Sequence, residues 1–212
     1  MRPTDRSVMS ASAPPIADQR RRLIVGGAGS ALAAGLAIPR QLLAQPTGAS
    51  SCPALLRHSL PRLQDDQPVA LCDFAGKVLL VVNTASYCGF TPQYEGLERL
   101  HGRLSSRGLV ILGFPSNDFG QQEPGNSTQI GAVCFNTYGV RFPMFAKIRV
   151  AGPDAHPLYA ELTRATGEPP RWNFHKYLID RSGRPLASYP SRVAPDAAPL
   201  VRAIEKALAE RV

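Results

Sequence analysis

From Cys52 onward, apolar positions switch between two spacings along the chain. Short apolar runs rich in β-branched residues predict strands, and apolar residues three to four positions apart predict amphipathic helices. Alternating segments of the two kinds favour an α/β domain with a central sheet. The predicted strands span residues 57–63, 68–72, 77–82 and 108–114, and the predicted helices span residues 93–103, about 128–137 and 156–166.

The last forty residues predict a hairpin followed by a helix. Alternating apolar residues flank Arg181-Ser182-Gly183, which is a good turn sequence, so residues 172–180 and 185–189 are predicted to pair. The final helix is expected to begin near Asp196, a favourable N-cap residue, and its apolar face holds Leu200, Ile204 and Leu208.

A single cysteine, Cys88, stands at a predicted strand-to-helix corner, in the sequence NTASYCGFTPQYEGL. Backbone N–H groups and the helix dipole at such a corner favour the thiolate, which is the nucleophilic form of cysteine. This placement indicates a reactive cysteine. A small buried hydrophobic side chain is the alternative, and the corner alone does not decide between the two.

The first 49 residues predict an export signal and not a folded segment. Three arginines, Arg20 to Arg22, precede the Gly/Ala-rich apolar run LIVGGAGSALAAGLAI, and small residues follow. The paired arginines and weak hydrophobicity resemble a twin-arginine signal, with cleavage after Ala44 or Ala49. An uncleaved anchor is disfavoured because the run is shorter than the roughly 20 residues that span a bilayer. Residues 50–212 are then one exported, periplasmic domain.

Charge argues against a nucleic-acid partner. The net charge is +8, but six basic and two acidic side chains lie before Ser50, so half of the excess belongs to the predicted signal. The remaining charges are scattered and form no basic block. The cysteine and histidine spacings contain no C-x-x-C and no H-E-x-x-H pattern, so no metal site is expected.

Three segments together resemble the glutathione peroxidase family: NTASYCGFTPQ, FPSNDFGQQEPGN and RWNFHKYLID. The likeness runs from about Ser59 to Ala209, with the motifs in the family's order. It implies a thioredoxin-like α/β fold, in which helices flank a central mixed sheet and a β-hairpin comes first. It also implies a cysteine-type (non-selenium) thiol peroxidase that reduces hydrogen peroxide and organic or lipid hydroperoxides without a cofactor.

The resemblance also assigns roles to four residues. Cys88 falls at the position that attacks peroxide, and Gln122, Trp172 and Asn173 fall at its partners. The chemistry agrees, because amide and indole N–H groups are donors that stabilise a thiolate and polarise the departing oxygen. The product is a sulfenic acid at Cys88. Singly, the three partners have ordinary explanations as a loop amide, a core anchor and a turn residue. With Cys88, they favour an active site.

Cys134 resembles the resolving cysteine of the thioredoxin-dependent branch of the family. A sulfenic acid captured by a second thiol becomes a disulfide, which an external thioredoxin-type dithiol, or glutathione, then reduces. A buried structural thiol is the alternative. Some relatives carry an extra cysteine where this chain has Ser116.

Cys52 and Cys72 lie in a chain expected to be exported, where disulfides persist, so a structural bridge between them is predicted. Lipid attachment at Cys52, or two free thiols, are the alternatives.

Other functions on a similar fold need residues that this chain lacks. A disulfide oxidoreductase needs a cysteine where Thr91 stands, a peroxiredoxin needs Thr or Ser in place of Ala85, and a copper-binding assembly factor needs a cysteine at Pro92. Only a short stretch separates Thr166 from Trp172, without the insertion that tetrameric relatives use, so a monomer is expected.

Overall fold

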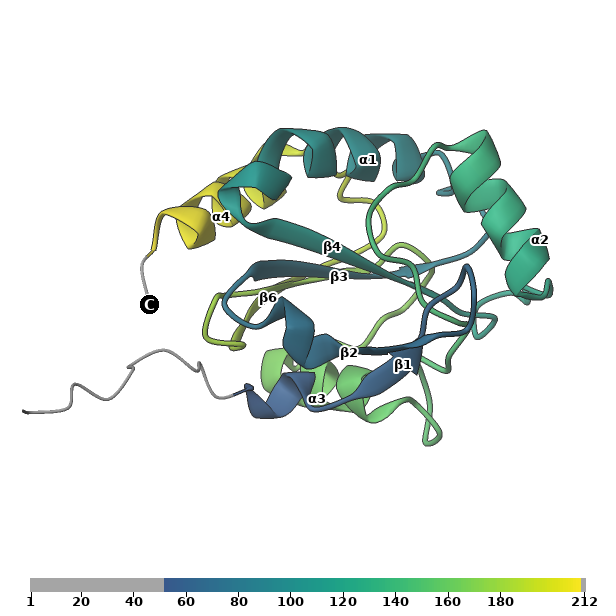
Figure 1. Cartoon of the computed structure of the whole chain (residues 1–212), viewed down its shortest axis with the longest axis horizontal. Helices are drawn as coiled ribbons and strands as arrows, with labels where there is room; N and C mark the ends of the chain where they lie inside the picture. Colours follow the sequence, from purple (N-terminus) through teal and green to yellow (C-terminus); the bar gives the residue numbers. More distant parts are fainter. Residues whose placement is uncertain (1–51, 211–212) are drawn as a thin grey trace, which may run out of the picture. The chain divides into compact units, whose positions relative to one another are not determined.

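A four-stranded mixed sheet lies at the centre of the described chain (Figure 1). The structure is a computed structural model that describes residues 52–210, so the predicted export signal lies outside the described residues. The inner strand β3 (Val78–Thr84) is parallel to β4 (Leu109–Pro115) and antiparallel to β5 (Lys176–Ile179). β6 (Pro185–Tyr189) pairs antiparallel with β5 and completes the sheet.

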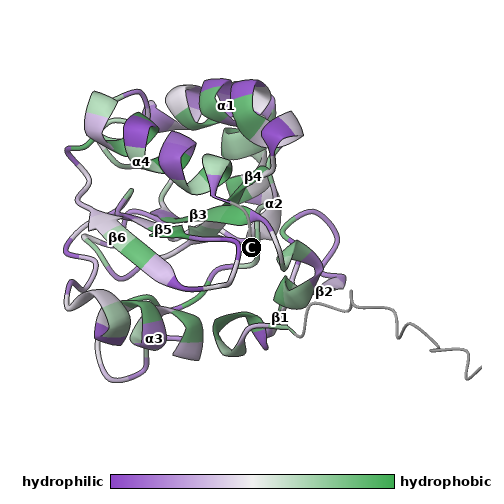
Figure 2. Ribbon diagram, turned by 90° about the vertical axis from the view of Figure 1, so that its left-hand side faces the viewer, coloured by the Kyte–Doolittle hydropathy of each residue, from purple (hydrophilic) through white to green (hydrophobic). Residues whose placement is uncertain are grey.

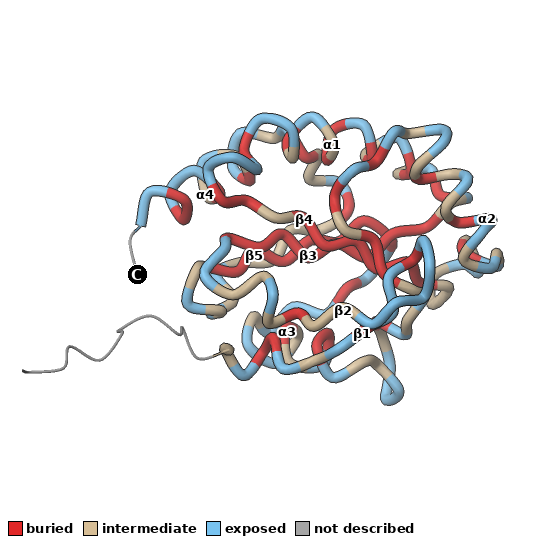
Figure 3. The backbone as a smooth tube through the Cα atoms, viewed as in Figure 1, coloured by how far each residue is buried: buried red, intermediate tan, exposed pale blue. Residues whose placement is uncertain are grey.

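Helices cover both faces of this sheet. α1 (Gln93–Leu104) and α4 (Ala198–Ala209) lie on one face and α3 (Pro157–Thr166) on the other (Figure 2). Every residue of β3 is buried, and the strands form the buried centre of the tube drawing (Figure 3). Alternate β3 side chains serve two cores, because Leu80 and Val82 pack on the α1 side while Leu79 and Val81 pack on the α3 side.

A short hairpin precedes the sheet. β1 (Ser59–Pro61) pairs antiparallel with β2 (Pro68–Ala70), and two 3-10 turns, Ala54–Leu56 and Leu71–Phe74, flank them. A disulfide joins Cys52 to Cys72 across these turns, with the two Cα atoms 5.3 Å apart. The hairpin strands are shorter than predicted, and Cys72 lies in a 3-10 turn and not in a strand. A bridged Cys52 has no free thiol for lipid attachment.

The segment after the Gln122 loop is helical, as predicted, but not uniformly α-helical. α2 (Ser127–Gly131) begins with a capping box in which Asn126 and Gln129 exchange side-chain-to-backbone hydrogen bonds at 3.0 Å. It continues as a π-helix, Ala132–Thr137, and Cys134 lies within that π-helix. A further 3-10 turn, Ser105–Arg107, follows α1.

Two predictions about the C-terminal part are wrong. The strand expected from residue 172 begins only at Lys176, because Phe174 adopts a left-handed backbone (φ +63°) that interrupts an extended run. Asp196 does not cap α4: the N-cap is Ala197, and its side chain forms no capping hydrogen bond. The helix start is favoured instead by a proline at its first turn, Pro199.

None of the helices between residues 52 and 210 combines the length and apolar character that a membrane crossing requires.

Candidate active site

Cys88 lies on the turns that connect β3 to α1, and a threonine holds this corner in shape. The Cys88 backbone N–H donates to Thr91 Oγ1 at 3.1 Å, and that hydroxyl donates onward to the Ala85 carbonyl at 2.9 Å. Cys88 is 7% exposed, and its Sγ accepts from the Phe90 N–H at 3.4 Å. The donor to sulfur is therefore a turn amide that precedes α1. Thr91 is therefore the residue that closes the turn. From the sequence, Thr91 indicates only that a second cysteine is absent at that position.

The loop between β4 and α2 brings Gln122 to the same corner. Two consecutive left-handed residues, Gly120 (φ +61°) and Gln121 (φ +51°), reverse the chain just before Gln122. The Tyr87 N–H donates to the Gln122 carbonyl at 3.0 Å, which joins the loop to the residue before Cys88.

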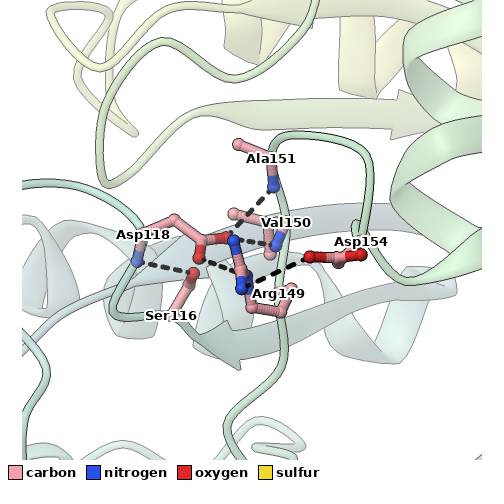
Figure 4. Close-up of polar contacts among 6 residues, drawn as sticks. All are labelled: Ser116, Asp118, Arg149, Val150, Ala151 and Asp154. Carbon is pink, nitrogen blue, oxygen red and sulfur yellow. Dashed lines mark hydrogen bonds and ion pairs between the residues drawn. The ribbon is translucent and has the colours of Figure 1, made fainter.

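Figure 4 shows how this loop is anchored at its first turn. The Asp118 carboxylate accepts from the backbone N–H groups of Val150 at 2.6 Å and Ala151 at 3.1 Å, and it pairs with Arg149 Nε at 2.9 Å. The Asp118 N–H donates to Ser116 Oγ at 3.3 Å. A carboxylate with several fixed donors holds its segment rigidly, so the backbone that carries Gln122 starts from a fixed point.

Asn173 joins the third segment to Gln122. Its Nδ2 donates to Gln122 Oε1 at 3.0 Å. The oxygen of the Gln122 amide is thus engaged, and this side chain can offer the two N–H groups of its Nε2 to the reacting atoms. Asn173 is fully buried. Its segment is held to the end of β3 by Asn83, whose Nδ2 donates to the Trp172 carbonyl at 3.1 Å and whose carbonyl accepts from the Phe174 N–H at 2.6 Å.

Trp172 lies at the surface of this site. Its side chain is 39% exposed, which excludes the core-anchor explanation, and its ring centroid lies 6.0 Å from that of Phe119. A Cβ at Gly120 would lie 3.3 Å from the indole, so a glycine there lets the loop pass close to the ring. Within residues 52–210, no hydrogen bond joins Cys88 Sγ to Gln122, Trp172 or Asn173. Their segments are brought together instead by hydrogen bonds from backbone N–H groups and from the side-chain amides of Asn173 and Asn83.

Cys134 and Cys88 are both buried free thiols, so the two are not bridged to each other. Burial raises the pKa of the Cys134 thiol to about 12, and the nearby Glu123 carboxylate contributes to the same effect. The protonated thiol is therefore the dominant form of Cys134 in this conformation.

Two buried charged residues at the site, Glu123 and Lys176, were not predicted from the sequence. Glu123 is fully buried, and burial raises its pKa to about 7. Lys176 is also fully buried, and burial lowers its pKa to about 7. Its Nζ donates to Gln93 Oε1 at 2.6 Å and to the carbonyls of Phe174 at 2.7 Å and Val193 at 2.8 Å. In a sequence, both residues look like ordinary surface charges.

Within the described residues, no cluster of three or more His, Cys, Asp or Glu side chains forms a metal-binding group.

Comparison with known proteins defines the class. The sequence model of the glutathione peroxidase family matches residues 58–163. The hydroperoxy fatty acid reductase of Synechocystis sp. is 53% identical over 142 residues, which cover 62% of this chain and 84% of that protein. The crystal structure of Trgpx in its apo form matches with a TM-score of 0.61 and 35% identity, covering 76% of this chain and 98% of that one.

The fold is thioredoxin-like. A thioredoxin family thiol:disulfide interchange protein from Chlorobium tepidum, only 16% identical, matches with a TM-score of 0.55 over 71% of this chain and 92% of that one. A mixed sheet flanked by helices and preceded by a small antiparallel hairpin agrees with the predicted fold class. The chain belongs to the glutathione peroxidase family, and it is a thiol peroxidase with cysteine at position 88.

Proposed function

We propose that Cys88 is the thiol that attacks peroxide and that Gln122, Trp172 and Asn173 surround the reacting sulfur. The observation that carries this proposal is the convergence of three distant segments on one corner. Tyr87 bonds the Cys88 turn to the Gln122 backbone, and the Asn173 amide bonds to the Gln122 side chain. Amide and indole N–H groups suit attack on a peroxide, because they can stabilise the thiolate and the departing oxygen without adding a negative charge of their own.

The reaction at Cys88 follows from this arrangement. The thiolate sulfur attacks one peroxide oxygen, the O–O bond breaks, and Cys88 becomes a sulfenic acid. The other oxygen leaves as an alcohol, or as water when the substrate is hydrogen peroxide, after it takes up a proton. N–H donors aimed at the reacting atoms stabilise the charge that moves from sulfur to the departing oxygen.

The second half of the cycle is assigned to Cys134. Its thiol attacks the Cys88 sulfenic acid, and the resulting disulfide is reduced by an external dithiol protein of the thioredoxin type, with glutathione as the alternative reductant. Support comes from the π-helix around Cys134, because π-helical turns are rare and often occur at functional sites. A disulfide requires the two sulfurs to come within about 2 Å, and the two thiols are unbridged here, so the segments that carry them have to move toward each other during turnover.

Substrate and location extend the proposal. The name of the similar Synechocystis protein, hydroperoxy fatty acid reductase, supports fatty-acid hydroperoxides as substrates beside hydrogen peroxide. The predicted twin-arginine signal supports export of a monomeric domain to the periplasm, and the Cys52–Cys72 disulfide is compatible with that location. Sequencing the N-terminus of protein recovered from the periplasm tests the cleavage, and sedimentation of the same material tests the monomer.

Single-cysteine variants test the two thiol roles. Cys88→Ser is expected to abolish peroxide consumption with either reductant. Cys134→Ser is expected to react once with peroxide, leave sulfenic acid at Cys88 and lose turnover with thioredoxin. Peroxide consumption and mass spectrometry after trapping with dimedone give both results. Substantial activity of Cys88→Ser would refute the nucleophile, and wild-type turnover of Cys134→Ser with thioredoxin would refute the resolving role.

A further inference from the structure

A buried acidic side chain lies on the loop that is hydrogen-bonded to the Cys88 turn, and its charge acts on the Cys134 thiol. Glu123 directly follows Gln122 and is fully buried. Its backbone is fixed at both ends, because its N–H donates to Asn117 Oδ1 at 2.8 Å and its carbonyl accepts from Lys147 Nζ at 3.0 Å. Within residues 52–210, neither carboxylate oxygen has a hydrogen-bond partner. A carboxyl group buried in this way is costly, so its presence calls for an explanation.

The groups that face Glu123 come from four segments. Burial raises the pKa of Glu123 to about 7. The polar groups of Ser86 in the Cys88 turn and the positive charge of Lys147 act in the opposite direction and lower it. Tyr94 of α1 and Cys134 of the π-helix lie within the field of the carboxylate. Their own burial raises their pKa values, and the Glu123 charge adds to the effect on each. Among the described residues, the hydroxyls of Ser86 and Tyr94 also have no hydrogen-bond partner.

The resolving step needs a group of this kind. A buried thiol with a pKa of about 12 is protonated at neutral pH, and a protonated thiol is a poor nucleophile. A base is most effective when its pKa is close to the working pH. We propose, resting on the function proposed above, that Glu123 is the proton acceptor of the resolving step: its carboxylate takes the thiol proton of Cys134 as that sulfur attacks the Cys88 sulfenic acid.

The step balances without another reactant. The Cys134 sulfur supplies the electron pair of the new S–S bond, and the S–O bond of the Cys88 sulfenic acid breaks. The hydroxide that departs receives the proton held by Glu123 and leaves as water. The Cys134 sulfur is oxidised, the Cys88 sulfur is reduced, and Glu123 returns to its starting form.

A pH series of single turnovers tests the proposal. Reduced full-length enzyme is mixed with one equivalent of hydrogen peroxide, quenched with acid at set times and analysed by mass spectrometry for the Cys88–Cys134 disulfide. The rate of disulfide formation in the wild type should rise about 30-fold between about pH 5.5 and about pH 8 and then level off, because a carboxyl with a pKa of about 7 ionises over that interval. Direct ionisation of Cys134 would instead make the rate rise without levelling off.

Glu123→Gln keeps the size and polarity of the side chain and removes the base. We expect this variant to form the disulfide slowly and with no plateau near pH 7, while Cys88 sulfenic acid still accumulates. Glu123→Asp restores a carboxylate and should recover a pH-dependent rate that levels off. Glu205→Gln, an exposed carboxylate on α4, is the matched control and should behave like the wild type.

The outcomes separate this inference from the proposal on which it rests. If the wild type forms no Cys88 sulfenic acid or no Cys88–Cys134 disulfide, the proposed function fails. If the disulfide forms and Glu123→Gln matches the wild type across the pH series, only the role of Glu123 fails. If Glu123→Gln does not fold, the wild-type profile alone decides, since a rate that is flat or still rising above about pH 8 overturns the assignment.

Discussion

Asn173 is the residue on which the geometry of the site most depends. Its one amide group donates to both Gln122 Oε1 at 3.0 Å and the Phe119 carbonyl at 3.4 Å, so it fixes the Gln122 loop from within the core. The structure also explains why it stays in place, because Asn83 at the end of β3 holds the residues on either side through their backbones. An amide buried at such a junction orients a neighbouring donor and is therefore worth more than one hydrogen bond.

Asn173→Ala should slow the reaction of Cys88 with peroxide by on the order of 10²-fold, because the Gln122 amide loses the bond that orients it. The rate is measured by stopped-flow after adding hydrogen peroxide to the reduced enzyme. Gln64→Ala, which removes an exposed amide from the β1–β2 hairpin turn, is the control. A wild-type rate in a folded Asn173→Ala protein would show that the buried amide does not position the site.

At the scale of elements, the site is built where β3, α1 and the segment before β5 meet. Lys176 links these parts, because its ammonium donates to Gln93 at the first position of α1, to Phe174 and to Val193. All three acceptors are neutral oxygens. The Lys176 ammonium therefore forms hydrogen bonds, but no ion pair offsets the free-energy cost of burying its charge.

Lys176→Met keeps the aliphatic length of the side chain and leaves these acceptors unpaired, so we expect it to lower the free energy of unfolding by at least about 1–3 kcal/mol. The sign of the pH dependence follows from linkage. The folded-state pKa of Lys176 is lowered to about 7 from 10.5, so the unfolded chain binds the extra proton between those values. The stability of the wild type relative to Lys176→Met should therefore increase as pH rises from about 7 toward 10.5 and level off below about 7, where both states bind the proton.

Urea unfolding of both proteins at several pH values in this range gives the difference directly, and the other titrating groups cancel in it. Lys206→Met, at an exposed position of α4, controls for the loss of one positive charge. A difference that stays constant with pH would show that Lys176 keeps its proton throughout, held by its three acceptors.

The apolar pattern predicted some elements closely and others poorly, for physical reasons. β3, β4 and α1 lie within one or two residues of their predicted bounds, because burial on both sides of a strand or on one helix face leaves a clear pattern. The π-helical segment at Cys134 is only six residues long, which is too short for its wider spacing to be distinguished from that of an α-helix in the apolar pattern. The positive φ of Phe174 leaves none either, since that conformation is rare for aromatic residues.

The residues of the candidate site also differ in how far the sequence predicts them. Cys88, Gln122, Trp172 and Asn173 were predicted because their motifs resemble a family, and the structure brings their segments together. Glu123 and Lys176 were not found, since only the packing around a charged side chain reveals that it is buried. Burial brings the pKa values of both side chains to about 7, so their protonation changes near neutral pH. Groups with such shifted pKa values often occur at functional sites, although the sequence gives no sign of them.

At the scale of the whole molecule, the Cys52–Cys72 disulfide fixes the start of the described chain. It closes a loop of about twenty residues around the β1–β2 hairpin, and Leu55, Leu56 and Leu60 of this region pack into the core on the α3 side of the sheet. A cross-link of this length removes conformational freedom mainly from the unfolded chain. Cys52 packs against the core on the α3 side of the sheet, whereas Cys88 and Cys134 belong to the core on the α1 side, so the bridge is expected to affect stability and not the reaction with peroxide.

The double variant Cys52→Ser/Cys72→Ser, in which both bridge sulfurs are removed, should therefore lower the free energy of unfolding by about 3 kcal/mol, as loop-closure entropy gives for a loop of this size. Equilibrium urea unfolding measures the change. The loss should be nearly absent when wild type and variant are compared under a reductant strong enough to open the bridge.

The initial rate of the reduced double variant with hydrogen peroxide should stay within about twofold of the wild-type rate, because the substitutions change no group at Cys88. Equal unfolding free energies under oxidising conditions would show that the hairpin is held by its packing alone. A large loss of peroxide reactivity in the folded variant would show instead that the bridge supports the active site at a distance.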